Sequence, residues 1–336
     1  MHIATFKHSA AAAVLAVFSL SSLAAEVIAL PAFTSLKVFG DSLSDSGNNA
    51  LVFGGAVGGL PTGNSYVPPG APYASGTYSN GPVWVSAFAA AEGLPAAANP
   101  SLAGDGNYAY GGARTSTDGS GLPPSATAQL AGFLSGVIAL PSTGLYVIAI
   151  GGNDVRDVAQ AVGTGAPFST IATAAGAYAL AVGNMVDALQ AKGAKHIVVW
   201  DAPDVGKTPA AMSFGSGFAG LATTVAGAFN AALTGRLTGE AGVIPFDIFG
   251  IVDAIVANPG SYGLTNVIDA CGAVINSCNA SLSTALFYDG IHPSAAGQAL
   301  LATAMINTVA AAVPEPSTWL MLAAGVAVLV VRRRRA

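Results

Sequence analysis

Few side chains in this sequence can carry acid–base chemistry near neutral pH. Of the four histidines, His2 and His8 lie at the extreme N-terminus, so His196 and His292 remain. Asp289 stands three residues before His292, a spacing that lets both side chains come from one short loop or helical turn. Asp289 can then fix the tautomer of His292 and leave its other ring nitrogen as a general base. The alternative is a helix-capping aspartate beside a structural histidine.

Ser42 is the nucleophile that such a base can activate. It lies in Gly40-Asp41-Ser42-Leu43, directly after a segment that predicts a strand. A hydroxyl there can be exposed at the edge of a sheet, but it needs a base to remove its proton. By itself, Gly-Asp-Ser is a common turn sequence.

Two glycine-rich segments can supply hydrogen-bond donors to an oxyanion. Gly111-Gly112 follows one predicted strand, and Gly151-Gly152-Asn153-Asp154 follows the next. A glycine N–H can approach a developing negative charge without obstruction, and the Asn153 amide can donate to the same oxygen. Each pair of glycines taken alone is more often a turn.

Alternating strands and helices must bring these groups together. A continuous apolar run such as 145–150 is typical of a central parallel strand. Such an alternation predicts an α/β fold with a parallel sheet covered on both faces, and sites in such folds form beyond the carboxyl ends of the strands. We expect strands over 36–39, 107–110, 145–150, 196–200 and 243–246, and helices over 82–92, 125–137, 171–192, 218–237 and 293–309, with a further short helix after the strand over 243–246.

The two ends of the chain carry their own signals. Residues 1–24 have a weakly basic start, an apolar run and small residues at the cleavage positions, as in a secretory signal peptide. The alternative is an N-terminal membrane anchor, although the apolar run is too short to span comfortably. Residues 313–336 contain Pro-Glu-Pro, an apolar stretch and four arginines. The body is therefore expected to occupy residues 25–312.

Composition excludes several classes of protein for this body. Hydrophobic residues make up 52% of the chain and charged residues 9%, which excludes a charge-rich disordered protein. The body carries seven lysines and arginines against sixteen acidic residues, so nucleic acid is not an expected partner. With two histidines, a zinc site with several histidine ligands is not expected. Export makes a disulfide between Cys271 and Cys278 the expected pairing, with two free thiols as the alternative.

Four blocks, in order, resemble those of the GDSL esterase/lipase family, also called SGNH hydrolases: Gly40-Asp41-Ser42-Leu43, Gly111-Gly112, Gly151-Gly152-Asn153-Asp154 and Asp289-Gly290-Ile291-His292-Pro293. The resemblance implies a three-layer flavodoxin-like fold and ester hydrolysis through an acyl-enzyme, without metal or organic cofactor. Ser42 would be the nucleophile, His292 the base and Asp289 its partner. The resemblance also assigns the oxyanion hole to the Ser42 N–H, the Gly112 N–H and the Asn153 side chain, with Gly111 as the fallback for Gly112.

The C-terminal tail closely resembles the PEP-CTERM sorting tail of Gram-negative bacteria. Pro314-Glu315-Pro316 precedes an apolar stretch from Trp319 to Val331, and Arg332 to Arg335 follow. The resemblance implies transient membrane contact through the tail, processing by an exosortase, and delivery to the envelope surface or the exopolysaccharide matrix. A plain tail anchor is the alternative.

The sequence leaves the substrate open. Tyr66, Tyr73 and Tyr78 lie in a loop over 51–81 that either lines a cleft or is exposed to solvent. A lipid ester and an acetylated carbohydrate both fit the resemblance. The rival function is a non-catalytic matrix or adhesion protein that retains the fold. Among the remaining polar residues, we expect His196 to be structural and Asp45 and Asp154 to shape loops, while Arg114 either contacts substrate or holds its loop.

Overall fold

The computed structural model describes residues 33–313, apart from residue 56 and residues 119–122 and 275–277. Of the C-terminal tail it describes only residues 325 and 333. The predicted signal peptide and nearly all of the predicted sorting tail therefore lie outside the described residues. Residues Phe33–Val313 form one compact unit.

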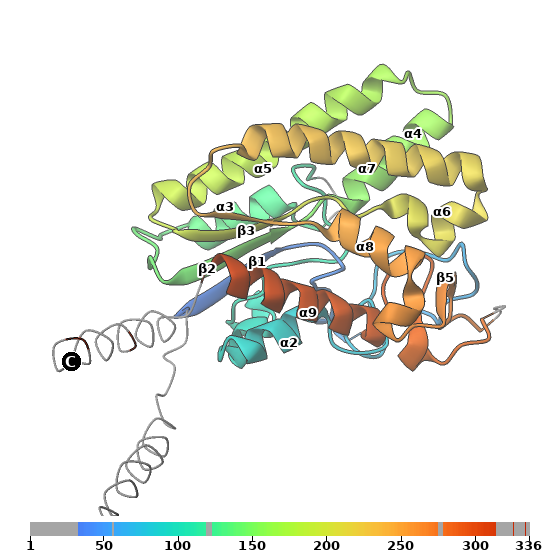
Figure 1. Cartoon of the computed structure of the whole chain (residues 1–336), viewed down its shortest axis with the longest axis horizontal. Coiled ribbons are helices and arrows are strands. Elements are labelled where there is room, and N and C mark those ends of the chain that lie inside the picture. Colours follow the sequence, from blue (N-terminus) through green and yellow to red (C-terminus); the bar gives the residue numbers. More distant parts are fainter. Residues whose placement is uncertain are drawn as a thin grey trace, which may run out of the picture. The chain divides into compact units, whose positions relative to one another are not determined.

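Four parallel strands form the central sheet, in the order β1-β2-β3-β4 (Figure 1). They are β1 (Ser35–Gly40), β2 (Gly144–Ala149), β3 (His196–Trp200) and β4 (Val243–Phe246). All six residues of β2 are buried, as a strand covered on both faces requires. Val38, Val147 and Val198 lie side by side in the register. The predicted α/β fold with a central parallel sheet is confirmed.

The strand predicted over 107–110 does not form as a regular strand. Asn107 makes an isolated parallel bridge with Val38, and the Tyr108 N–H donates to the Val38 carbonyl at 2.7 Å. The Tyr110 N–H likewise donates to the Gly40 carbonyl at 3.2 Å, but the Gly40 N–H donates to the Gln129 side chain at 2.9 Å instead of to this segment, which removes one bond from the ladder. The segment still runs along the outer edge of β1, which gives the spatial order 106–110, β1, β2, β3, β4.

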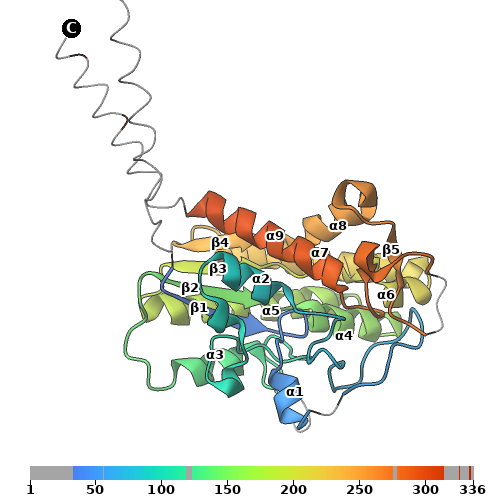
Figure 2. The same cartoon turned by 90° about the horizontal axis from the view of Figure 1, so that it is seen from below.

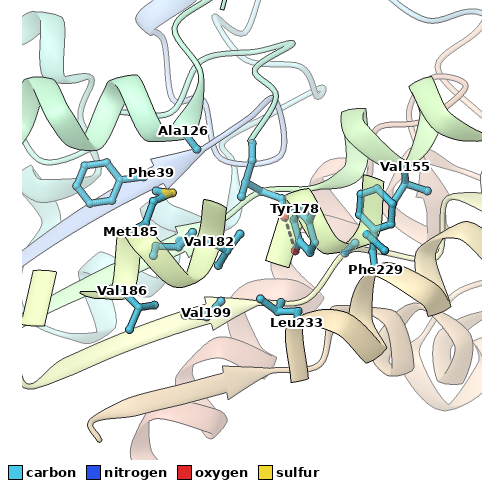
Figure 3. Close-up of a cluster of buried hydrophobic side chains, with 14 of the residues drawn as sticks. Phe39, Ala126, Val155, Tyr178, Val182, Met185, Val186, Val199, Phe229 and Leu233 are labelled. Atoms are coloured by element: carbon cyan, nitrogen blue, oxygen red, sulfur yellow. Dashed lines mark hydrogen bonds between the residues drawn. The ribbon is translucent and has the colours of Figure 1, made fainter. Parts of the chain in front are cut away.

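One face of the sheet is covered by α3 (Ala126–Leu134), α4 (Gly152–Gly163), α5 (Ser169–Ala191) and α7 (Ser216–Leu237) (Figure 1). Figure 3 shows the apolar core between these helices and the strands, with Phe39, Val182 and Phe229 among its buried members. The sequence prediction missed α4, because its polar first turn was read as part of a loop. Its buried Val155, Ala159 and Val162 have the helical spacing that could have indicated it.

The opposite face is covered by α2 (Trp84–Ala91) and α9 (Ala295–Ala312), which pack against each other (Figure 2). Trp200 of β3 contacts Trp84 with ring centroids 4.8 Å apart, and its Nε1–H donates to the Met305 sulfur at 3.1 Å. Large aromatic surfaces buried in this way contribute strongly to the stability of a core. The sheet is thus the middle layer of three.

Short elements complete the domain around the sheet. They are α1 (Asn48–Val52), α6 (Pro209–Ser213), α8 (Ile248–Ala257), the parallel pair β5 (Asn266–Ala270) and β6 (Ala285–Phe287), and 3₁₀ turns at Pro95–Ala98, Ser101–Ala103, Val205–Lys207, Pro259–Tyr262 and Leu282–Thr284. Among the described helices, α5 and α9 are long and apolar enough to cross a membrane, but both pack into the domain as its core helices do.

Asp201, directly after β3, makes stability depend on pH. Burial, and then the nearby Asp247 carboxylate, raise the pKa of Asp201 from 3.8 to about 7. A raised pKa in the folded state contributes stability that is present below the unfolded value and is lost as pH rises through about 7. We therefore expect Asp201→Asn, which is neutral throughout, to be more favourable relative to the parent at pH 8 than at pH 5. Urea unfolding of the variant and the parent at pH 5 and pH 8 measures the difference in their free energies of unfolding, and the exposed Asp187→Asn is the control. If Asp201→Asn differs from the parent by the same free energy at both pH values, the expectation is contradicted.

Candidate active site

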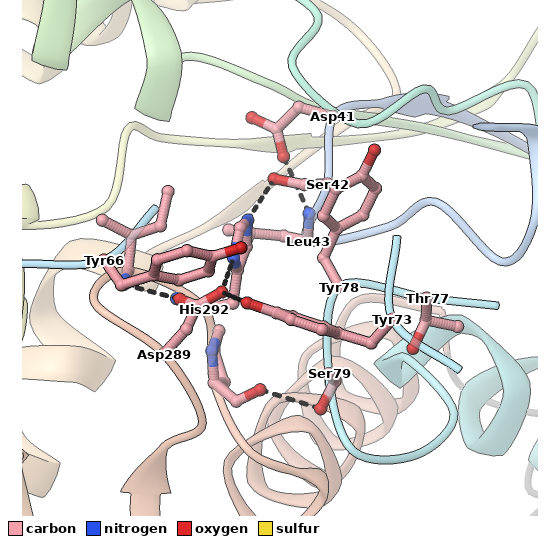
Figure 4. A network of polar contacts seen from close by, with 12 residues as sticks. Asp41, Ser42, Leu43, Tyr66, Tyr73, Thr77, Tyr78, Ser79, Asp289 and His292 are labelled. Carbon is pink, nitrogen blue, oxygen red and sulfur yellow. Dashed lines mark hydrogen bonds and ion pairs between the residues drawn. The ribbon is translucent and has the colours of Figure 1, made fainter. Parts of the chain in front are cut away.

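The structure brings Ser42, Asp289 and His292 together at the carboxyl end of β1 (Figure 4). The His292 Nε2 lies 2.8 Å from the Ser42 Oγ, although the two residues are 250 positions apart. The His292 Nδ1 lies 2.6 Å from the Asp289 Oδ2. The side chains are buried, with 7% of Ser42, 3% of His292 and 0% of Asp289 exposed. A hydroxyl, an imidazole and a carboxylate in this series can generate a nucleophilic oxygen.

The Asp289 carboxylate accepts hydrogen bonds at both of its oxygens. Its Oδ1 accepts from the backbone N–H groups of Ile291 and His292, at 2.8 and 2.7 Å. Its Oδ2 accepts from the Tyr73 hydroxyl at 2.6 Å, in addition to its contact with the His292 ring. The two backbone bonds arise because Asp289 begins a tight turn between β6 and α9, and they fix the plane of the carboxylate.

The buried Asp45 carboxylate decides which glycine N–H faces the cavity above Ser42. The Gly111 N–H donates to the Asp45 Oδ2 at 2.8 Å, so this donor is already used. Gly112 has φ of +84°, which turns its peptide relative to that of Gly111. Among the described residues, no acceptor lies within hydrogen-bond distance of the Gly112 N–H or of the Ser42 N–H. Both backbone groups border the same cavity.

The Asn153 side chain is held by contacts at both ends of its amide. Its Nδ2 donates one hydrogen to the Ala113 carbonyl at 2.9 Å, and its Oδ1 accepts from the Arg156 guanidinium at 3.1 Å. Because α4 begins at Gly152, Asn153 lies in the first turn of the helix and beside Ser42 in the cavity wall. The second Nδ2 hydrogen remains for a ligand oxygen.

Comparison with known families agrees with this geometry. Residues 36–305 match the model of the GDSL-like lipase/acylhydrolase family, and residues 312–335 match the PEP-CTERM protein-sorting motif. The chain belongs to the GDSL-like lipase/acylhydrolase family. Its tail carries a motif that indicates export to the cell envelope of Gram-negative bacteria.

Several curated relatives come from Pseudomonas. An uncharacterized protein of the trpE-trpG intergenic region of Pseudomonas putida is 29% identical over 324 residues, which are 85% of this chain and 50% of that protein. Proteins named esterase EstA from Pseudomonas aeruginosa and from Pseudomonas putida are each 39% identical over 123 residues, which are 32% of this chain and 19% of each esterase. The chain thus spans half or less of the length of these relatives.

Two further polar residues predicted from the sequence, Asp154 and Arg114, hold the loops of this GDSL-like site, whereas His196 lies at the start of β3, the end of the strand away from the site. Asp154 accepts from the Thr115 N–H and hydroxyl, each at 3.0 Å, and burial raises its pKa to about 6. Arg114 pairs with Asp157 at 2.9 Å and donates to the Gly112 carbonyl at 2.7 Å. These contacts favour the loop-holding alternative for Arg114, although it also borders the cavity. His196 packs its ring against Phe33 at 5.4 Å.

Asp41, beside Ser42, is itself buried. Its Oδ1 accepts from the Leu43 N–H at 3.0 Å, and its carbonyl accepts from the Ser44 and Asp45 N–H groups. Burial raises the pKa of Asp41 to about 6. These bonds close the turn that presents Ser42 at the end of β1.

Three cavities meet at Ser42 or beside it. The largest, of about 840 Å³, lies over Ser42 and is bordered by aromatic and apolar side chains, including Phe53, Tyr78 and Tyr110. One of about 520 Å³ continues past Arg156 and Ile291, which border both. A narrow apolar one of about 70 Å³ runs from Ser42 between α8 and α9. Among the described residues, no group of three His, Cys, Asp or Glu side chains is placed to hold a metal ion.

The Cys271–Cys278 disulfide is present, with Cα atoms 5.3 Å apart. The Cys271 N–H donates to the Phe287 carbonyl at 3.1 Å, and the Gly272 N–H donates to the Tyr288 carbonyl at 2.8 Å. The bridged segment thus borders the two residues that precede Asp289. The disulfide therefore closes a segment that is hydrogen-bonded directly to the approach to the Asp289–His292 turn.

Sequence reasoning missed two functional candidates, Tyr73 and Arg156. Tyr73 borders a separate cavity of about 670 Å³, as one of the two predicted alternatives required, but its side chain is buried and its hydroxyl bonds Asp289. Arg156 lies one helical turn after Asn153, at the i,i+3 spacing that places two side chains on one helix face. That spacing was the available signal for Arg156; for Tyr73 there was none, because its contact spans 216 positions.

Asp45 should be essential for the folded site loops. It accepts from the N–H groups of Gly47, Asn48, Asn49 and Gly111, and it is completely buried. Asp45→Asn turns an NH₂ group toward these donors, so we expect a loss of about 1–3 kcal/mol in the free energy of unfolding. Urea unfolding measures it, and the exposed Asp187→Asn should change stability by at most about 1 kcal/mol. Equal effects of the two substitutions would contradict the assigned role of Asp45.

Proposed function

We propose that this protein is an exported serine ester hydrolase that acts through an acyl-enzyme. The observation that carries the proposal is the continuous series of contacts from Ser42 through His292 to Asp289, at 2.8 and 2.6 Å. A helix-capping aspartate beside a structural histidine has no reason to aim the free ring nitrogen at a serine hydroxyl. Membership of the GDSL-like lipase/acylhydrolase family supports the same reaction class.

The reaction follows from these contacts. The His292 Nε2 takes the proton of the Ser42 hydroxyl as the Oγ attacks the ester carbonyl carbon. Asp289 stabilises the imidazolium that forms. The imidazolium then gives its proton to the leaving alcohol as the ester C–O bond breaks, which leaves the acyl group on Ser42. A water molecule, deprotonated by His292, attacks the acyl-enzyme and frees the acid and the serine.

The negative oxygen of each tetrahedral intermediate needs donors that are not used elsewhere. The N–H groups of Ser42 and Gly112 and the second Nδ2 hydrogen of Asn153 meet this requirement. Gly111 does not, because its N–H bonds Asp45. We therefore assign the second backbone donor to Gly112. Donors that are already fixed in place need no reorganisation as charge develops.

Two substrate classes fit the cavities: a lipid ester and an acetylated carbohydrate. The cavity over Ser42, of about 840 Å³, can admit one bulky group, and its apolar and aromatic border suits either an alkyl chain or the face of a sugar ring. The relatives named esterase support an ester without specifying its alcohol or acid. A non-catalytic adhesion protein would have no need for the assembled Ser42, His292 and Asp289.

The nucleophile is tested with Ser42→Ala in the body that lacks the tail. We expect p-nitrophenyl acetate hydrolysis to fall by about 10³-fold or more, because the alcohol that forms the acyl-enzyme is lost. Ser44→Ala is the matched control, since Ser44 lies in the same turn but its Oγ accepts from the Trp84 Nε1–H at 3.1 Å. Equal rates for Ser42→Ala and the parent would overturn the proposed function. Rates across p-nitrophenyl esters of increasing chain length then distinguish a lipid esterase from a deacetylase.

We also propose that an exosortase processes the tail before the protein reaches the envelope surface or the matrix. The support is the sorting motif over 312–335. In the native host, replacing Arg332 to Arg335 by serine should leave the unprocessed chain in the membrane fraction, because four arginines hold the cytoplasmic end of the apolar stretch. Immunoblots of cell fractions follow both forms. Unchanged processing would contradict this role of the arginines.

A further inference from the structure

A long loop without charged side chains crosses the Asp289–His292 turn and is hydrogen-bonded to it. Residues 46–91 contain no Asp, Glu, Lys or Arg. Within this segment, the Asn64 side chain bonds Asp269 and the Ala270 N–H, each at 2.9 Å, and the Tyr66 carbonyl accepts from the Gly290 N–H at 2.8 Å. A Cβ at Gly290 would lie 2.4 Å from that carbonyl, so the loop passes close to the turn.

Tyr73 is the residue of this loop that reaches the reacting groups. Its side chain is buried, with 3% exposed, and its hydroxyl donates to the Asp289 Oδ2 at 2.6 Å (Figure 4). The same oxygen contacts the His292 Nδ1 at 2.6 Å. The Tyr73 ring packs edge-on against Tyr288, with centroids 4.8 Å apart and planes at 86°. Packing therefore fixes the direction from which the hydroxyl meets the carboxylate.

We propose that Tyr73 is a positioning residue for the hydrolysis, acting on His292 through Asp289. Its hydroxyl shares the Oδ2 lone pairs with the imidazole, holds the carboxylate facing the ring, and takes up part of the negative charge. The inference rests on the proposed function, because it assigns Tyr73 a part in the same proton transfer.

Because Tyr73 and His292 share the Oδ2 oxygen of Asp289, the direction in which the pH profile moves without the Tyr73 hydroxyl can be predicted. A donor on Oδ2 disperses the carboxylate charge, and so it limits how strongly Asp289 stabilises the protonated His292. Without the hydroxyl, the imidazolium gains stability and the neutral base is present only at higher pH. Removing the Tyr73 hydroxyl leaves unchanged the other titratable or charged groups near Asp289 and His292. These groups are Asp41, Tyr66, Tyr78, Arg156 and Tyr288.

Tyr73→Phe removes the hydroxyl and keeps the ring packing. We expect kcat for p-nitrophenyl acetate to fall about ten-fold, because the donor that holds Oδ2 toward the imidazole is lost, and the poorer alignment of His292 with Ser42 slows proton transfer more than the stronger pairing of the imidazolium speeds it. KM should change little, because the hydroxyl faces Asp289 and the large cavity over Ser42 is not bordered by Tyr73. The acid limb of the kcat/KM profile should move up by about half a pH unit.

Tyr288→Phe is the matched control. It removes a hydroxyl from the ring that packs against Tyr73, and none of the described side chains or carbonyls accepts a hydrogen bond from it. This variant should keep the parental kcat and acid limb. A lower kcat for Tyr73→Phe with an unmoved acid limb would indicate a merely structural role and overturn the proposal.

A double-mutant cycle keeps the test decisive if Tyr73→Phe also loses stability. In an Asp289→Asn background, Tyr73→Phe should change kcat less than two-fold, because the carboxylate through which it acts is gone. The same ten-fold loss in both backgrounds would contradict the proposal.

Ser42→Ala distinguishes a failure of the proposed hydrolase function from a failure of the role assigned to Tyr73. If Ser42→Ala retains parental activity, the proposed function fails. If Ser42→Ala is inactive while Tyr73→Phe matches the parent, only the role of Tyr73 fails.

Discussion

The central constraint of this structure is a carboxylate, that of Asp289, held entirely away from water. Among the described residues, no lysine or arginine forms an ion pair with it. A buried carboxylate without hydrogen bonds would be neutral rather than charged. Two backbone N–H groups, the Tyr73 hydroxyl and the His292 ring meet it instead. The turn, the uncharged loop and the last helix are therefore joined at one residue.

Other aspartates around the site are also held by hydrogen bonds from the backbone rather than by ion pairs with a lysine or arginine of the described part of the chain. Asp41 and Asp45 are also buried, Asp154 is half-buried, and all three accept hydrogen bonds from backbone N–H groups. Glycine exposes its N–H on all sides, so glycine-rich turns suit this use. The shift of both Asp41 and Asp154 to a pKa of about 6 shows that burial outweighs these bonds. Only 9% of the chain is charged, yet many of its aspartates surround one serine.

The sequence predicted the sheet, and it indicated the residues that meet at Ser42, because both depend on local signals. Apolar runs marked β2 and β3, and short motifs placed Ser42, Asn153 and His292 just beyond strand ends or at the start of the last helix. The part that could not be predicted depends on distant contacts. The 107–110 segment has strand composition, but the Gln129 side chain, 89 positions from Gly40, takes the Gly40 N–H that a regular pairing with β1 would use. Likewise, Gly111 and Gly112 are equivalent in sequence, and it is the contact of Gly111 with Asp45 and the positive φ of Gly112 that distinguish them.

The boundary between the domain and its tail has a physical basis of its own. Helix α9 ends at Ala312, and the Val313 N–H still donates to the Val309 carbonyl at 2.9 Å. Pro314 has no N–H with which to continue this pattern, and it disfavours the helical conformation in the residue before it. The sorting motif starts at residue 312, where the last helix is already complete. Cleavage near Pro314-Glu315-Pro316, as the proposed processing requires, would leave residues 33–313 whole, with every contact described for the sheet and for Asp289.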